Sequence, residues 1–233
     1  MIALLNRIVG TAGVAGLLSG LLLTGVQQLQ LAPLIRDAER YEATAAQTSS
    51  ALHDHAAPDP DAGMPQAGLR RTLNTGLANI VVAIGFALLL ASAMSSRASS
   101  GYRAGIAWGA AGYAVFFVSP ALGLPPRLPG ADAAPLLARE LWWGLAVLCT
   151  AAGLWLAALQ RNRALCLMGV FLLVVPHAIG APQPQITANS IPADLEREFI
   201  FAAFFANAVL WLALGTSTGY FLGTRRPRPA HTD

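Results

Sequence analysis

Six stretches of this sequence contain no Asp, Glu, Lys or Arg, and each comes close to the roughly 20 residues that a helix needs to cross a hydrocarbon layer of about 30 Å. They cover residues 8–29, 74–95, 104–122, 141–160, 164–181 and 199–222. Charged residues make up only 12% of the chain, whereas a typical soluble domain has about 25%. We therefore predict an all-α integral membrane protein, a bundle of about six transmembrane helices forming a single membrane domain over residues 1–233.

The fifth stretch is the weakest of the six, because Pro176 and His177 lie near its end. A bundle of five helices with a re-entrant fifth segment therefore stays open as an alternative. In the first stretch, Gly13, Gly16 and Gly20 are spaced by three and four residues. This spacing places small residues on one helical face, where a neighbouring helix can pack closely.

The arginines predict how the bundle is oriented. In a six-helix bundle the amino terminus, the second and fourth loops and the carboxyl terminus share one side of the membrane. These short segments hold Arg7, Arg97, Arg103, Arg161, Arg163, Arg225, Arg226 and Arg228, with Asp233 as their one acid. Because short, positively charged segments stay in the cytoplasm, we predict that both termini are cytoplasmic.

The long outer loop after the first helix covers residues 32–72. Its first half is rich in Ala, Arg and Glu, so we expect it to continue the first helix above the membrane, and its second half to be flexible. That second half contains His53 and His55 around Asp54. Two imidazoles with nearby carboxylates suit Co²⁺, Ni²⁺ or Zn²⁺, although from the residues alone solvated loop side chains are the preferred explanation.

Within the membrane, His177 is the most notable polar residue. Pro176 before it removes a helical hydrogen bond and frees a carbonyl oxygen, and polar groups at this depth are often functional. A ligand on an ion pathway and a helix-end histidine bonded to a neighbouring helix are equally good explanations.

Three further features have both a structural and a functional explanation. The run 119–130 contains Pro125 and Pro126, and it predicts either a vestibule or a rigid turn of irregular backbone at the outer surface. Trp142 and Trp143 fit an aromatic belt. We also expect three asparagines to face the bundle interior, where they would bind helices together or pass an ion: Asn74, Asn79 and Asn207.

The sequence gives no support to an enzyme. All fifteen basic residues are Arg, so a P-loop lacks its Lys. Neither H-E-x-x-H nor G-x-S-x-G occurs, and no Asp or Glu lies deep in a predicted span. Cys149 and Cys166 both lie in apolar runs, where a cysteine behaves as a small hydrophobic residue. We therefore expect neither an enzymatic activity nor a cofactor.

Several blocks in the same order make the chain resemble the CbtA family, proposed cobalt transporter subunits of bacteria whose genes are associated with cobalamin synthesis. The blocks are Pro33-Leu34-Ile35 with Ala38-Glu39-Arg40-Tyr41-Glu42, Arg71-Thr72-Leu73 with Leu77-Ala78-Asn79, Pro120-Ala121-Leu122-Gly123-Leu124-Pro125-Pro126 with Leu128-Pro129-Gly130, Ala138-Arg139 with Trp142-Trp143, and Pro176-His177 with Gly180-Ala181-Pro182-Gln183-Pro184. The chain departs from the family pattern at Arg70 and Arg127, where an acid is common, and at Glu140, where Gln is common. A metal-binding role at positions 70 and 127 is accordingly not expected.

The resemblance implies uptake of Co²⁺, with Ni²⁺ as the alternative, together with a small CbtB-type subunit of one membrane helix. It makes His177 the best metal candidate and Glu39 and Glu42 acceptors for the arriving ion, beside the His53/His55 pair. Asn79, Asn207, Pro125, Pro126 and Trp142 are the candidate pathway or vestibule residues.

A bacterial inner membrane location follows from the same resemblance. The expected partners are the lipid bilayer, the small subunit and a divalent metal ion, with no nucleic acid; a homo-oligomer stays open. The competing function is a scaffold or assembly factor that binds partner helices without moving metal.

Overall fold

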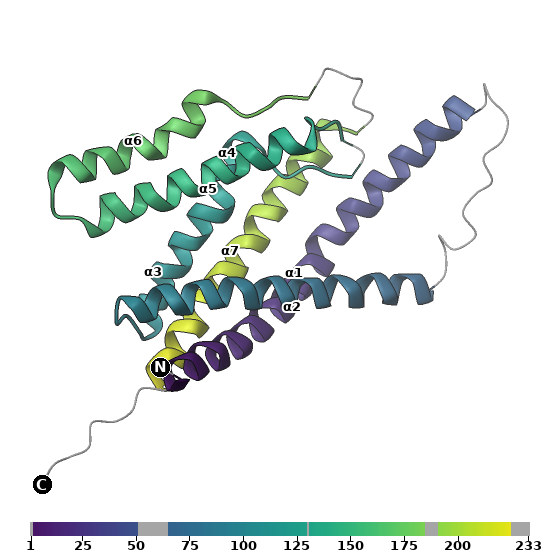
Figure 1. Ribbon diagram of the computed structural model, residues 1–233. Coiled ribbons are helices and arrows are strands. Elements are labelled where there is room, and N and C mark those ends of the chain that lie inside the picture. Colours follow the sequence, from purple (N-terminus) through teal and green to yellow (C-terminus); the bar gives the residue numbers. More distant parts are fainter. Residues whose placement is uncertain (1, 51–64, 130, 185–190, 225–233) are drawn as a thin grey trace, which may run out of the picture. The chain divides into compact units, whose positions relative to one another are not determined.

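The computed structural model describes residues 2–50, 65–129, 131–184 and 191–224, and in these residues it contains helices and no strands (Figure 1). The helices are α1 (Ile2–Ser50), α2 (Pro65–Ser96), α3 (Tyr102–Tyr113), η1 (Ala114–Val118), α4 (Ser119–Gly123), α5 (Leu136–Leu159), α6 (Arg163–Ile179) and α7 (Ala193–Thr224). The prediction of an all-helical membrane protein is confirmed.

Five helical stretches in the described part of the chain are long and apolar enough to cross a membrane. They are Ile2–Thr44, Gly68–Ser96, Tyr102–Gly123, Leu136–Ala158 and Ala193–Thr224. The remaining apolar helix, α6, has 17 residues, which makes it about 26 Å long. Pro176 does not end α6; the helix stops after Ile179, where Gly180 takes a φ of 84° that suits glycine. The protein is thus a multi-pass membrane protein.

Helix α1 continues well beyond the first apolar stretch. It contains 49 residues and ends at Ser50, so the prediction that the first half of the outer loop extends the first helix is confirmed. The second half of that loop, residues 51–64, lies outside the described residues.

The chain divides into two compact units. Unit 1 contains Met1–Val26, Gly63–Gly112 and Ala206–Asp233, and unit 2 contains Gln27–Ala62 and Tyr113–Phe205. Each unit is described by itself below.

Unit 1 is held together by close approaches at glycine. A Cβ atom on Gly16 of α1 would lie 2.5 Å from the Cα of Ile84, and one on Gly20 would lie 2.6 Å from the Cα of Ile80, both on α2. The predicted packing face is therefore confirmed for these two glycines. It is wrong for Gly13, where an added Cβ has nothing within 4 Å.

A second glycine interface in unit 1 joins α3 to α7. Cβ atoms added at Gly109 of α3 and at Gly215 of α7 would each come closer than 3.0 Å to backbone atoms of the other helix. Real Cβ contacts essentially never reach that distance, so these two backbones pack as tightly as their residues allow. The side chains of Ala91, Met94 and Leu222 form a buried cluster beside this interface.

Unit 2 contains two helices of opposite direction, α5 and α6, which lie side by side (Figure 1). A Cβ atom on Gly153 would lie 2.8 Å from the carbonyl oxygen of Gly169, so the two helices also meet at small residues. A separate apolar cluster joins Ala38 of α1 to Leu128, Ile191 and Phe199. This cluster fixes the second half of α1 against the segment that precedes α5.

Candidate functional site

The helix that starts as α3 changes its hydrogen bonding just before Ser119. The backbone N–H of Ser119 donates to the carbonyl of Ala114, five residues earlier, and residues Ala114–Val118 form one turn of π-helix. Pro120 follows, and it has no N–H to donate and clashes with the carbonyl four residues back. Such single π-turns are frequent at functional sites.

The irregular backbone predicted for residues 119–130 begins later than expected. Residues Ser119–Gly123 are helical as α4, and the helix ends there. The described residues from Leu124 to Pro135 contain no helix, as predicted for that part of the run. The first five residues of the run therefore belong to a membrane-spanning helix, because Pro at the first turn of a helix is tolerated.

Three polar side chains from three helices of unit 2 meet at Ser119. Its Oγ lies 2.7 Å from Oγ1 of Thr150 on α5, and 3.4 Å from Nε2 of His177 on α6. Ser119 and Thr150 are buried, and His177 is half-buried. Either hydroxyl can donate to the other, and an imidazole nitrogen without its proton can accept from Ser119. We call these three residues the hydroxyl–imidazole cluster.

Trp142 forms one wall of this cluster. Its indole lies edge-on to the imidazole of His177, with ring centroids 6.1 Å apart and an interplanar angle of 66°. The indole Nε1 is buried and has no hydrogen-bond partner among the described residues. An aromatic belt therefore explains the exposed Trp143 but not Trp142, which is only 6% exposed.

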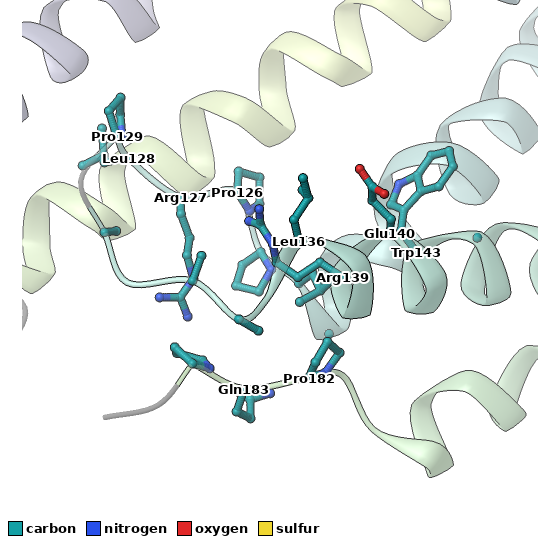
Figure 2. A pocket seen from close by; sticks show the side chains of 18 residues that line it. Pro126, Arg127, Leu128, Pro129, Leu136, Arg139, Glu140, Trp143, Pro182 and Gln183 are labelled. Atoms are coloured by element: carbon teal, nitrogen blue, oxygen red, sulfur yellow. The ribbon is translucent and has the colours of Figure 1, made fainter. Parts of the chain in front are cut away.

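An open pocket of about 1020 Å³ lies in unit 2 between the segment after α4, the first turns of α5 and the segment after α6 (Figure 2). Pro125 and Pro126, the predicted vestibule residues, both line it. So do two arginines, Arg127 and Arg139. Their positive charges oppose the entry of a divalent cation.

The two acidic metal candidates lie on the second half of α1. Glu39 and Glu42 are both half-buried. Ala38, the residue before Glu39, is fully buried in the cluster with Leu128. Neither glutamate is among the residues that line the pocket.

The asparagines have different environments in unit 1. Asn79 is half-buried and its Nδ2 donates to Oγ1 of Thr24 on α1, at 3.0 Å. Asn207 is half-buried on α7. Asn74 is exposed on α2, so the expectation that it faces the bundle interior is wrong.

The remaining metal candidates, His53 and His55, lie outside the described residues. Within residues 2–50, 65–129, 131–184 and 191–224, no group of three or more His, Cys, Asp or Glu side chains is placed to hold a metal ion. The hydroxyl–imidazole cluster instead offers one nitrogen and two oxygen atoms.

Sequence reasoning did not single out Ser119 and Thr150 as site residues. A usable signal exists for each of them: Ser119 stands directly before a proline in an apolar run, and Thr150 is the one hydroxyl residue of 141–160. No sequence pattern indicates that the two hydroxyls meet.

Comparison with known proteins identifies a family. The model of a family described as "Probable cobalt transporter subunit (CbtA)" matches residues 5–223, which is nearly the whole chain. No curated protein and no solved structure matches.

Proposed function

Since this chain belongs to the CbtA family of probable cobalt transporter subunits, we propose that it is the membrane subunit of a divalent-metal uptake transporter whose substrate is Co²⁺, with Ni²⁺ as the alternative. It acts with a small CbtB-type subunit of one membrane helix. It resides in the bacterial inner membrane with both termini in the cytoplasm, and it has no enzymatic activity.

The observation that carries this proposal is the placement of His177 beside Ser119 and Thr150. A neutral imidazole nitrogen is a good ligand for Co²⁺ and Ni²⁺, and hydroxyl oxygens are weaker ones. A permeating ion must bind well enough to enter and weakly enough to leave. The Oγ of Ser119 lies 3.4 Å from Nε2 of His177 and 2.7 Å from Oγ1 of Thr150. One nitrogen with two hydroxyl oxygens suits transient binding of this kind.

Two prolines support the same location. Pro120 follows Ser119 and Pro176 precedes His177, and neither proline can donate a backbone hydrogen bond. A proline inside a helix leaves one carbonyl oxygen without its helical partner, and such an oxygen can help to coordinate an ion inside a membrane protein. Carbonyl oxygens of this kind are further candidate ligands for the ion.

The outer residues give the proposed order of events. The loop with His53 and His55, together with Glu39 and Glu42, collects the ion, which then reaches His177. Pro125 and Pro126 stay the vestibule candidates of this route, and of the charged residues that line the same pocket the two arginines oppose a cation whereas Glu140 favours one. Asn207 remains a candidate for the inner part of the crossing.

The scaffold alternative receives less support. It relies on a glycine face that is free to receive a partner helix. Gly16 and Gly20 already pack against Ile84 and Ile80 of the same chain, and only Gly13 of the three has nothing within 4 Å. The transporter proposal uses the buried polar side chains that a scaffold does not need.

The test is accumulation of radioactive cobalt in cells that lack other uptake systems. Three strains are compared: one expresses the wild-type protein alone, one expresses it with the one-helix subunit, and one expresses the His177→Ala variant of the protein with that subunit. The matched control is Val174→Ala, which truncates an exposed residue of the same helix. We expect His177→Ala to reduce accumulation to background at unchanged membrane abundance, and Val174→Ala to keep it.

Two results would contradict the proposal. Full accumulation by His177→Ala would remove His177 from the pathway. No accumulation of cobalt or nickel by the wild-type pair, with both subunits present in the membrane, would favour the scaffold.

A further inference from the structure

The arginine-lined pocket of unit 2 lies where membrane spans end. The span Tyr102–Gly123 finishes at Gly123, and the span Leu136–Ala158 starts at Leu136; both residues line the pocket. The ends of spans lie at the boundary between hydrocarbon and water, which is the level of phospholipid headgroups. Trp143, 42% exposed at the pocket, is a residue type favoured at that level.

The polar groups of the pocket are mainly hydrogen-bond donors. Arg127 uses Nη1 to bond the backbone oxygen of Asp132 at 2.7 Å, and a guanidinium carries four further N–H groups. The Nε of Arg139 is buried and has no acceptor among the described residues. Arg139 also lines the pocket, so an anionic ligand that accepts from its other guanidinium N–H groups would stabilise the arrangement.

The start of α5 adds to this positive character. Its N-cap is Pro135, which gives no side-chain hydrogen bond to the first turn, and Leu136 and Arg139 of that turn line the pocket. The free N–H groups of a helix start favour an anion.

One acid, Glu140, also lines the pocket. Figure 2 shows it well separated from Arg127, on the side of the pocket that Trp143 occupies. The lining therefore has two positive charges and one negative charge, with the acid apart from Arg127.

Apolar surface adjoins these donors. Leu136, Leu137 and Leu141 on the first turns of α5 are 62%, 66% and 67% exposed. In a membrane protein such leucines contact acyl chains, and the prolines of the pocket provide further apolar area. A ligand with an anionic head and an apolar body matches this combination.

We propose that the pocket binds the phosphate group of an anionic phospholipid, held by the guanidinium groups of Arg127 and Arg139, with its acyl chains along the start of α5. This site is separate from the hydroxyl–imidazole cluster and does not depend on metal transport. Basic pockets between membrane helices bind anionic headgroups in other membrane proteins.

The test uses the purified full-length chain in a neutral detergent, and it measures thermal unfolding and the bound lipid by native mass spectrometry. Phosphatidylglycerol is compared with phosphatidylcholine of the same chain length. We expect phosphatidylglycerol to raise Tm by a few degrees and to remain bound, and phosphatidylcholine to do neither. Arg127→Gln and Arg139→Gln should each lose both effects. Arg36→Gln, which removes an exposed arginine elsewhere in unit 2, should keep them.

Arg127→Gln keeps the test decisive if Arg139→Gln fails to fold, because Arg127 belongs to the segment outside the helices. Persistence of the phosphatidylglycerol effects in Arg127→Gln would overturn the proposal. A parallel titration with inorganic phosphate distinguishes the source of the anion: an equal rise of Tm with phosphate alone would overturn the assignment to a lipid.

Discussion

The indole of Trp142 occupies the space directly beside Gly123. A Cβ atom at position 123 would come closer than 3.0 Å to the ring of Trp142 and would lie 2.9 Å from the Cβ of Ala181. The same indole meets the edge of the His177 imidazole. The absence of a side chain at position 123 therefore allows Trp142 to form the wall of the hydroxyl–imidazole cluster.

Gly123→Ala is expected to displace Trp142 from His177. Overpacking of this kind costs about 1–3 kcal/mol, because the large ring is buried and has little space to move into. The measurements are thermal unfolding of the purified protein and cobalt accumulation in cells, and both should fall. Gly85→Ala is the control, since an added Cβ there has nothing within 4 Å. Equal behaviour of the two variants would contradict the packing described here.

Ser119→Ala and Thr150→Val should weaken unfolding stability in a coupled way. Their hydroxyls are 2.7 Å apart and buried, so each single change leaves the other hydroxyl without its partner. A double-mutant cycle should give a coupling energy of about 0.5–1.5 kcal/mol. Additive effects would show that the two hydroxyls do not bond to each other in the membrane.

Asn79→Leu and Thr24→Val are expected to lower stability by similar amounts, with little further loss when they are combined. The amide of Asn79 donates to the hydroxyl of Thr24, and hydrogen bonds between membrane helices average about 0.6 kcal/mol, with a maximum of about 1.7 kcal/mol. Cobalt accumulation per inserted protein distinguishes the two roles of Asn79. We expect Asn79→Leu to retain cobalt accumulation. Loss of accumulation by a variant of normal stability would place Asn79 on the ion pathway.

Gly109→Ala and Gly215→Ala should each destabilise unit 1 by about 1–3 kcal/mol, because an added methyl group forces the backbones of α3 and α7 apart. Gly13→Ala provides the comparison, since it adds the same methyl group where nothing lies within 4 Å. Chemical unfolding in mixed micelles measures the free energy of unfolding of the three variants. A loss of stability in Gly13→Ala as large as in the other two would contradict the assignment of the packing faces.

The helices were predictable because their signals are local. Stretches without charge predict spans from length alone, and the Ala, Arg and Glu residues after Leu31 predict the extension of α1 to Ser50. The span predicted for residues 104–122 contains most of α4 and is confirmed. The irregular backbone expected from residue 119 was wrong for residues 119–123, because proline is tolerated in the first turn of a helix.

The candidate site was only partly predictable. His177 stands out as a rare polar residue in an apolar run, whereas Ser119 and Thr150 become relevant only through contacts between helices. Spacing places Gly13, Gly16 and Gly20 on one face, but it cannot say which of them another helix reaches. Trp142 is buried and Trp143 is exposed. Because the two residues are identical and adjacent, the sequence does not indicate which of them packs against neighbouring helices.

The π-turn at Ala114–Val118 also determines the rotation of every residue that follows it. A bond across five residues instead of four adds one residue to a turn, so the helix from Ser119 onward is rotated by about 100° relative to an uninterrupted α-helix. Removing a single residue from this turn would keep the apolar length and nearly the same composition, yet it would direct Ser119 away from Thr150 and His177. The cluster thus depends on a count of residues along the chain as much as on their chemical identity.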